Sequence, residues 1–327
     1  MKFGTSQPVL RKEDVRFLTG AGRYVDDVAP AGAARAAFLR SPHAHADITS
    51  IDASAAREAP GVLAVITGAD LAKAMKNELN FATVTGRDGK PGAGPRRPAL
   101  AEDRVRFVGE AIALVVAETV GQARDAVDLI EVEFDELPAA TSTGEAESQP
   151  EVHPEIAPKN VAYDWAFGDA EATKAAFDAA AHVVELPLVN NRVICVSMEP
   201  RGITAEWKDG RLHVASNGQG VWNLKRELAD KLELKPEQVR VTNPDTGGGF
   251  GMKAFNYPEH LALAQAARRL EGRAVHWMSD RSEAMLTDNM GRDHVTIARA
   301  AFDAEHRLLA VHFAVKAGLG AYNSSFG

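Results

Sequence analysis

The chain has one cysteine, no long apolar run and no excess of basic residues. Cys195 is the only cysteine among 327 residues, which excludes an internal disulfide and any iron–sulfur or structural zinc site built only from cysteines of this chain. No stretch approaches the ~18 consecutive apolar residues of a membrane-spanning helix. The net charge of −8 argues against a general nucleic-acid or membrane-surface binder. We therefore expect neither nucleic acid nor a membrane span.

Targeting and metal-binding patterns are also lacking. The first residues, Met1–Pro8, contain no apolar segment, so we expect no signal peptide and a cytoplasmic location. His43 and His45 lie two residues apart, but no third ligand follows at a suitable spacing, and we interpret them as loop or strand residues. Cys195 lies in an apolar stretch and is interpreted as a small buried hydrophobe rather than a nucleophile.

The length and composition indicate a globular protein of about two domains. Hydrophobic residues make up 45% and charged residues 25% of the chain, as in ordinary soluble proteins. Residues 138–160 hold four prolines among acidic and small residues, which is typical of a linker. We predict one mixed α/β unit over 1–137, this linker, and a second unit over 161–327.

The clearest elements of the first unit lie near its end. The continuous apolar run 111–117 predicts a buried strand, Thr119 can cap a helix over 120–130, and 131–134 alternates as a strand. This strand–helix–strand unit suits a sheet backed by helices. Shorter elements are expected earlier: strands over 36–39 and 61–67, and a helical turn over 54–58.

The second unit mixes helices with strands. Leu224, Leu228 and Leu232 recur every four residues and predict an amphipathic helix over 221–233, with Trp222 close to the same face. Further elements are expected along this unit: a helix over 171–181, a strand over 183–188, and a hairpin formed by 294–301 and 308–315.

The most informative segment is the glycine-rich run Thr246–Lys253, with four glycines around Phe250. Glycine adds unfolded-chain entropy and buries no side chain, so the gain must come from the backbone, through positive φ angles or amides close to a bound group. Alternation at 239–241 predicts a strand before it, and Pro258 opens a helix after it, with apolar residues recurring over 261–270. Strand, glycine loop and helix together offer N–H groups to an anion or an oxo ligand.

Two nucleotide-binding motifs do not fit this run. A dinucleotide fingerprint needs G-x-G-x-x-G, and a phosphate-binding P-loop needs Gly-Lys-Ser/Thr, whereas Lys253 follows Met252 and precedes Ala254. The alternatives from the residues alone are a glycine-rich turn in a β-rich domain or a self-contained phosphate-binding module.

Several separate segments, in order, carry a family resemblance. They are Arg11–Asp14, Gly20–Asp27, Phe107–Glu110, Met198–Arg201, the glycine run, Asp280–Glu283 and Gly320–Tyr322. Together they resemble the N-terminal half of the molybdopterin-binding subunit of the xanthine oxidase family, most closely its carbon monoxide dehydrogenase-like bacterial branch. The resemblance implies an α+β (mixed α/β) fold, with an α/β-hammerhead domain over 1–137 and the first part of the molybdenum cofactor-binding domain over 161–327.

The same resemblance implies an oxidoreductase, a molybdenum hydroxylase active only with partner subunits. Molybdenum would be held by a molybdopterin, in its cytosine dinucleotide form, and oxygen derived from water would be inserted at a C–H bond of a small-molecule substrate. Electrons would pass to an Fe-S small subunit and on to FAD in a further subunit. The protein supplies positioning and hydrogen bonds, while the cofactor carries the chemistry.

Individual site residues follow from the family pattern. Gln219 matches the glutamine whose amide reaches an oxo ligand of the metal, and Phe250 and Gly251 match the segment whose backbone lies over the metal centre. Gly248 and Gly249 would let that backbone approach. No residue of the chain is expected to ligate the metal directly. Without the resemblance, Gln219 reads as an exposed residue near the start of a helix.

Departures from the family pattern narrow the substrate. The purine-oxidising branch has a glutamate where this chain has Ala254, which argues against a purine. The family's glutamate base has no counterpart in this sequence, and Leu319–Gly327 shows neither a capping helix nor a polar tail. We therefore expect a split subunit, whose C-terminal half is carried by a second molybdopterin-binding chain.

The expected substrates are an aromatic N-heterocycle resembling nicotinate or an aldehyde. Two alternatives stay open: a non-catalytic structural or assembly subunit with the same fold, and oxidation of the carbon monoxide dehydrogenase type.

Overall fold

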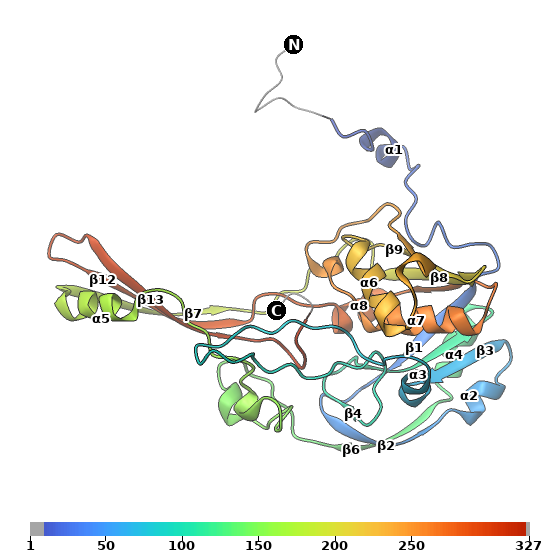
Figure 1. Ribbon diagram of the computed structural model, residues 1–327, viewed down its shortest axis with the longest axis horizontal. Coiled ribbons are helices and arrows are strands. Elements are labelled where there is room, and N and C mark those ends of the chain that lie inside the picture. Colours follow the sequence, from blue (N-terminus) through green and yellow to red (C-terminus); the bar gives the residue numbers. More distant parts are fainter. Residues whose placement is uncertain (1–9, 325–327) are drawn as a thin grey trace, which may run out of the picture.

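The computed structural model describes residues 10–324 and has the mixed α/β architecture expected from the sequence (Figure 1). Residues 1–9, which include the segment where we expect no signal peptide, and residues 325–327 lie outside the described residues. The strands are β1 (Ala34–Arg40), β2 (Ala46–Asp52), β3 (Val62–Thr67), β4 (Arg104–Val105), β5 (Ala111–Ala117), β6 (Glu131–Glu136), β7 (His182–Asn190), β8 (Gly202–Lys208), β9 (Arg211–Ser216), β10 (Val239–Thr242), β11 (Val275–Met278), β12 (His294–Phe302) and β13 (Leu308–Ala317). The helices are α1 (Asp14–Leu18), α2 (Ser54–Glu58), α3 (Gly68–Ala74), α4 (Val120–Val127), α5 (Ala170–Ala179), α6 (Trp222–Lys231), α7 (Pro258–Arg269) and α8 (Arg281–Thr287). Short 3-10 turns are η1 (Ala146–Ser148), η2 (Pro158–Asn160), η3 (Pro236–Gln238) and η4 (Met252–Ala254).

A seven-stranded sheet forms the body of the molecule, in the order β10-β9-β8-β11-β1-β5-β3. Its apolar core joins α3, α6 and α7 to one face, while α2 and α4 pack on the other. Strand β5 is buried along its whole length because both of its faces are covered. That position explains its continuous apolar sequence, which a strand with one solvated face would not need.

The seven-stranded sheet contains strands from both sides of the predicted linker. β1 from the first unit pairs in parallel with β11 from the second, with Ala34 opposite Val275 and Arg35 opposite His276. The predicted linker itself is folded, since the Asn160 side chain donates to the carbonyls of Ala146 (2.8 Å) and Pro150 (3.0 Å). The domain boundaries drawn from the sequence stay a prediction.

The expected strand–helix–strand unit forms, but its two strands do not share a sheet. Thr119 caps α4 as predicted, through a capping box with Gln122. The helix ends at Val127 rather than residue 130, because a turn closed by the Ile130 amide on the Val127 carbonyl directs Ile130 into the core. β6 then pairs with β2 in a separate three-stranded sheet of order β4-β2-β6.

Helix α6 is amphipathic as predicted, except at Trp222. Leu224, Leu228 and Leu232 are buried, whereas Trp222 is 71% exposed. A residue two positions before Leu224 is rotated by about 200° around a helix of 3.6 residues per turn, which puts it on the opposite face. The prediction that Trp222 shares the buried face was wrong.

The third sheet, in the order β13-β12-β7, projects from the body as an arm together with α5 (Figure 1). The predicted hairpin is confirmed, with β12 and β13 antiparallel from His294 opposite Ala317 onward. Strand β7 and strand β13 are exposed over almost their whole length. Within residues 10–324, no helix has both the length and the hydrophobicity to cross a bilayer.

Candidate functional site

Two loops meet at one edge of the body sheet. β9 and β10 are parallel neighbours, with Thr242 opposite Ala215 at their ends. The loop after β9 carries Gln219 and leads into α6, and the loop after β10 carries the glycine run and leads into α7. Because the carboxyl ends of parallel strands point the same way, both loops emerge at the same edge, where α/β sheets commonly bind ligands.

Gln219 is held directly against the glycine run. Its side-chain Oε1 accepts a hydrogen bond from the Gly251 backbone amide at 2.9 Å, and the backbone N–H of Gln219 donates to the Lys253 carbonyl at 2.9 Å. A Cβ added to Gly249 would lie 2.6 Å from the Gln219 side chain, so any other residue there would displace Gln219 from this position. The structure thus brings Gln219 together with the glycine segment that the sequence analysis paired with it.

The backbone of the glycine run is shaped by positive φ angles, at Gly248 (94°), Phe250 (52°) and Gly251 (88°). For a phenylalanine this conformation is uncommon and strained. The Phe250 ring is 71% exposed above the loop. Within the described residues, the amides of Gly248, Gly249 and Phe250 donate to no protein acceptor, while that of Gly251 is engaged by Gln219. Of the two residues whose backbone is expected to lie over the metal centre, only Phe250 therefore has an amide without a protein acceptor in the described structure.

Cys195 lies beside this loop and is only partly buried, contrary to the expectation of a buried hydrophobe. Its thiol lies 3.6 Å from the Phe250 carbonyl. The segment around it forms no strand of a sheet and leaves Val193 and Val196 more than 40% exposed. An apolar stretch in the sequence therefore did not correspond to a core position here.

Glu199 and Lys253 support the glycine run from the body side, and sequence reasoning assigned neither a role. Glu199 Oε2 accepts from the Gly247 amide at 2.8 Å and from Lys253 Nζ at 3.1 Å, while the Glu199 amide donates to the Gly247 carbonyl at 3.1 Å. A Cβ on Gly247 would lie 2.5 Å from that of Glu199. Burial lowers the pKa of Lys253, and the carboxylate of Glu199 offsets part of that effect.

A buried ionic cluster lies beneath the loop. The Arg201 guanidinium pairs with Glu259 at 2.8 Å and Asp288 at 2.5 Å, and it stacks 3.7 Å from the centre of the Tyr257 ring. Tyr257 in turn donates its hydroxyl to the Met252 carbonyl at 2.8 Å. Burial acts to raise the pKa of Glu259, but the charges of Arg201 and Arg40 dominate and hold it far below its ordinary value. The cluster thereby fixes the far end of the glycine loop.

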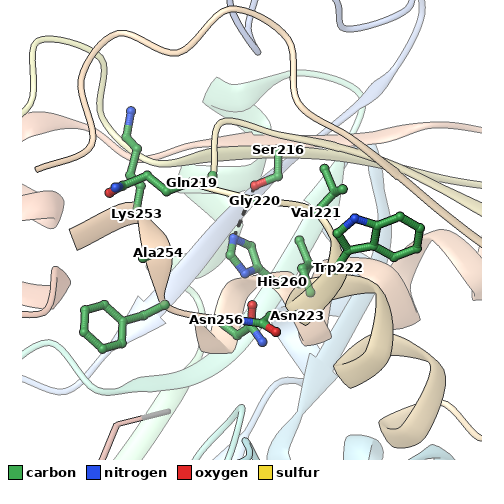
Figure 2. A pocket seen from close by; sticks show the side chains of 13 residues that line it. Ser216, Gln219, Gly220, Val221, Trp222, Asn223, Lys253, Ala254, Asn256 and His260 are labelled. Atoms are coloured by element: carbon green, nitrogen blue, oxygen red, sulfur yellow. Dashed lines mark hydrogen bonds between the residues drawn. The ribbon is translucent and has the colours of Figure 1, made fainter. Parts of the chain in front are cut away.

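A pocket of about 230 Å³ opens beside Gln219, between the start of α6 and the segment 253–256 (Figure 2). Its lining in the described chain includes no aspartate or glutamate. His260 points toward Ser216 inside it, with Nε2 3.5 Å from the Ser216 hydroxyl. Since Nδ1 accepts from the Tyr257 amide at 3.2 Å, the proton of the neutral ring is on Nε2. Burial, reinforced by Arg201, lowers the pKa of His260 to about 4, so the ring is neutral at pH 7.

Among residues 10–324, no three His, Cys, Asp or Glu side chains converge where they could hold a metal ion. The histidines singled out in the sequence have other contacts: His43 lies 3.4 Å from Glu136 and His45 contacts the Pro138 carbonyl at 3.0 Å.

The two parts of the chain match two known domain families. Residues 152–327 match the model of the molybdopterin cofactor-binding domain, and residues 19–138 match that of the aldehyde oxidase and xanthine dehydrogenase a/b hammerhead domain. The chain belongs to the xanthine oxidase family of molybdenum hydroxylases. The order of the two matches is the order expected from the sequence resemblance.

Individual relatives of this family align with nearly all of the chain. The nicotine 6-hydroxylase large subunit of Paenarthrobacter nicotinovorans is 36% identical over 96% of this chain and 38% of its own length. The carbon monoxide dehydrogenase large chain of Afipia carboxidovorans is 32% identical over 96% of this chain and 39% of its own. The structure of quinoline 2-oxidoreductase from Pseudomonas putida 86 aligns with a TM-score of 0.82 and 34% identity, covering 94% of this chain and 38% of that one. The chain thus spans about two fifths of the length of these relatives.

Proposed function

We propose that this chain forms one wall of the molybdenum site of a hydroxylase that oxidises a neutral aromatic N-heterocycle or an aldehyde. The observation that carries the proposal is the contact between Gln219 and the glycine run at the carboxyl edge of the sheet, in a chain of the molybdenum hydroxylase family. The remainder of the site would come from a second molybdopterin-binding chain, with an Fe-S subunit and an FAD subunit as electron-transfer partners.

The residues of the glycine run fit the anionic, oxo-bearing end of a molybdopterin, and its cytosine dinucleotide form stays a prediction. Gly249 can bear no side chain without displacing Gln219, so bare backbone faces outward at that point. The amides of Gly248, Gly249 and Phe250 are left without protein acceptors in the described structure, as an anionic or oxo-bearing group would require. When bound, the cofactor supplies insertion of water-derived oxygen into a C–H bond and accepts the two electrons released.

Gln219 has a defined orientation toward such a group. The Gly251 amide can only donate, so the side-chain atom facing it must be the carbonyl oxygen, Oε1. Nε2 is thereby directed away from that amide as a neutral hydrogen-bond donor. A neutral donor suits an oxo ligand because it polarises the oxygen without adding charge, and we assign Gln219 this role.

The pocket next to Gln219 supports the substrate class. Ala254 and the other lining residues provide no carboxylate, and the donor at the back of the pocket, His260, is neutral at pH 7. The charged residue of the lining, Lys253, has its ammonium paired with Glu199 at 3.1 Å. Such a lining suits an uncharged ring better than a purine held by an acidic side chain. The relatives named for nicotine and quinoline favour a heterocycle, and the one named for carbon monoxide keeps that oxidation as the second candidate. The cytoplasmic location stays a prediction.

Metal analysis of the purified assembly, with Gln219→Ala beside it, tests the proposal. We expect about one molybdenum per chain in the wild type, and a turnover reduced about 10- to 100-fold in Gln219→Ala with molybdenum retained, as for other residues that hydrogen-bond a metal's ligands. Gln238→Ala is the matched control, because η3 lies at the opposite end of β10. An assembly without molybdenum would instead support a structural subunit, and full turnover in Gln219→Ala would remove the role assigned to that residue.

A further inference from the structure

The arm presents one sheet face that nothing in the described chain covers. The register of the arm places Leu186, Ala298 and Phe313 side by side, and Val184, Ala300 and Val311 likewise. Residues directly opposite across strands lie on the same face of a sheet. We call the resulting surface the bare arm face; its large residues are Val184, Leu186 and Leu188 of β7 and Val311, Phe313 and Val315 of β13.

The bare arm face is apolar and exposed. Its six large side chains are between 44% and 59% exposed. The central strand contributes only small residues between them, Thr296, Ala298 and Ala300, so two apolar rows flank a lower middle strip. Soluble proteins rarely leave a continuous apolar sheet face of this kind open to water, and such faces mark interaction sites.

The opposite face of the same sheet has a partner within the chain. Helix α5 packs there, with the Arg299 guanidinium 4.8 Å from the centre of the Phe177 ring, and Ala301 is fully buried. Arg299 also pairs with Glu185 at 3.4 Å. Helix α5 covers only the part of this face near Arg299 and Ala301, since Val189 and Ile297 of the same face remain 74% and 36% exposed. The bare arm face differs in having no such helix packed on it within the described residues.

The relatives indicate what the missing layer is. They align with 96% of this chain, while about three fifths of each relative has no counterpart in this sequence. The arm lies inside the region that matches the molybdopterin cofactor-binding domain. An uncovered face within this domain fits a partner that supplies the part of the relatives without a counterpart here.

We propose that the bare arm face is the docking surface for the second molybdopterin-binding chain, which lays an apolar face of its own across β7, β12 and β13. The inference rests on the proposed function, because it assigns a location on this chain to the partner required there. Pro187 within the edge strand β7 cannot donate to a further strand, which disfavours extension of the sheet at that edge. The exposed apolar side chains of the bare arm face favour docking through the face over extension of the other edge strand, β13.

A paired substitution on β13 tests the surface. Phe313→Glu places a charge in the bare arm face, and His312→Glu places the same charge one residue away, on the face that carries α5. This chain is produced in its native host with an affinity tag, and the co-purified polypeptides are matched by mass spectrometry to the uncovered part of the family's subunit. We expect Phe313→Glu to reduce recovery of that polypeptide and of molybdenum at least tenfold, and His312→Glu to retain both.

Folding and alternative occupants are checked on the same samples. Hydrogen exchange of β5 should be the same in both variants and the wild type, because Phe313 is exposed and fills no cavity in the body. Slowed exchange of β7 and β13 in the wild-type assembly, relative to the purified chain, supports the inference. Normal recovery of partner and molybdenum with Phe313→Glu overturns it while leaving the proposed function intact. Sedimentation showing a dimer of this chain that Phe313→Glu abolishes identifies a second copy as the occupant and also overturns it. A wild-type assembly without molybdenum refutes the proposed function, and the inference with it.

Discussion

The body and the arm use similar apolar strands with opposite outcomes. Strand β5 of the body is buried on both faces by helices of the same chain, whereas β7 and β13 of the arm expose nearly every residue. An alternating or continuous run of apolar residues therefore predicts which side chains pack against another element. It does not predict whether that element belongs to the same chain. The site loops are held by contacts within the body, whereas the bare arm face is the surface on which we propose that a second chain packs.

The largest difference between body and arm should appear in the free energy of unfolding that is lost when one ion pair is broken in each region. Glu259→Gln removes a carboxylate buried with Arg201, which should lower the free energy of unfolding by about 3–5 kcal/mol because a buried guanidinium loses its main counter-charge. Glu185→Gln breaks the exposed arm pair with Arg299 and should cost less than about 1 kcal/mol. Chemical denaturation of the purified proteins measures both, and equal losses would contradict the contrast.

Truncation of one apolar side chain in each region should give a difference in unfolding free energy almost as large as that for the ion pairs. Leu114→Ala in β5 creates a cavity in a fully buried position and should destabilise the chain by about 2–5 kcal/mol. Phe313→Ala on the bare arm face should change the stability of the isolated chain by no more than about 0.5 kcal/mol. Urea unfolding decides between this outcome and one in which the arm is already packed in the isolated chain, where Phe313→Ala would also be costly.

The body should also carry a specific pH dependence. The pKa of His260 is about 4 in the folded chain against an ordinary 6.5, so between these values the unfolded state binds a proton that the folded state refuses. Stability is therefore lost as the pH falls from about 6.5 to 4, by roughly 3 kcal/mol in total. His260→Gln should flatten this part of the profile of unfolding free energy against pH. His312→Gln on the arm serves as the control, and an unchanged slope in His260→Gln would refute the assignment.

The smallest effect should arise within the site itself. Gly249→Ala forces the Gln219 side chain to move, because the new methyl would lie 2.6 Å from it. We expect turnover of the assembled enzyme to fall about tenfold, near the lower end of the range for displaced groups that hydrogen-bond a metal's ligands. Gly121→Ala, in α4, provides a comparison in which the nearest atom to the added Cβ, Thr119 Oγ1, lies 4.0 Å away. Unchanged turnover in Gly249→Ala would show that the position of Gln219 is unimportant.

Local sequence signals predicted elements well and their assembly poorly. The helical turn Ser54–Glu58, the cap at Thr119 and the helix opened by Pro258 followed from propensities that act over a few residues. The separation of β5 and β6 into different sheets did not, because strand pairing depends on contacts between distant segments. Trp222 was misplaced by counting proximity in sequence instead of angle around the helix.

The site was accessible only in part. The composition of the glycine run indicated a special role for that segment. Its contact with Gln219, however, depends on the parallel pairing of β9 and β10, and only the family resemblance connected Gln219 with the glycine run. Glu199 was missed because its role lies in hydrogen bonds to the Gly247 backbone and to Lys253, 48 and 54 residues away along the chain. A charged residue beside Pro200 gives no sign in the sequence of such distant contacts.

The pairing of β1 with β11 has a mechanical consequence for the molecule. Hydrogen bonds between these strands tie the early and late parts of the chain together independently of the covalent connection through 138–160. A protease cut within that connection would leave both fragments bound to each other, and heating would melt them in one step. Both sequence units thus contribute strands to one sheet, and the two site loops leave that sheet after β9 and β10.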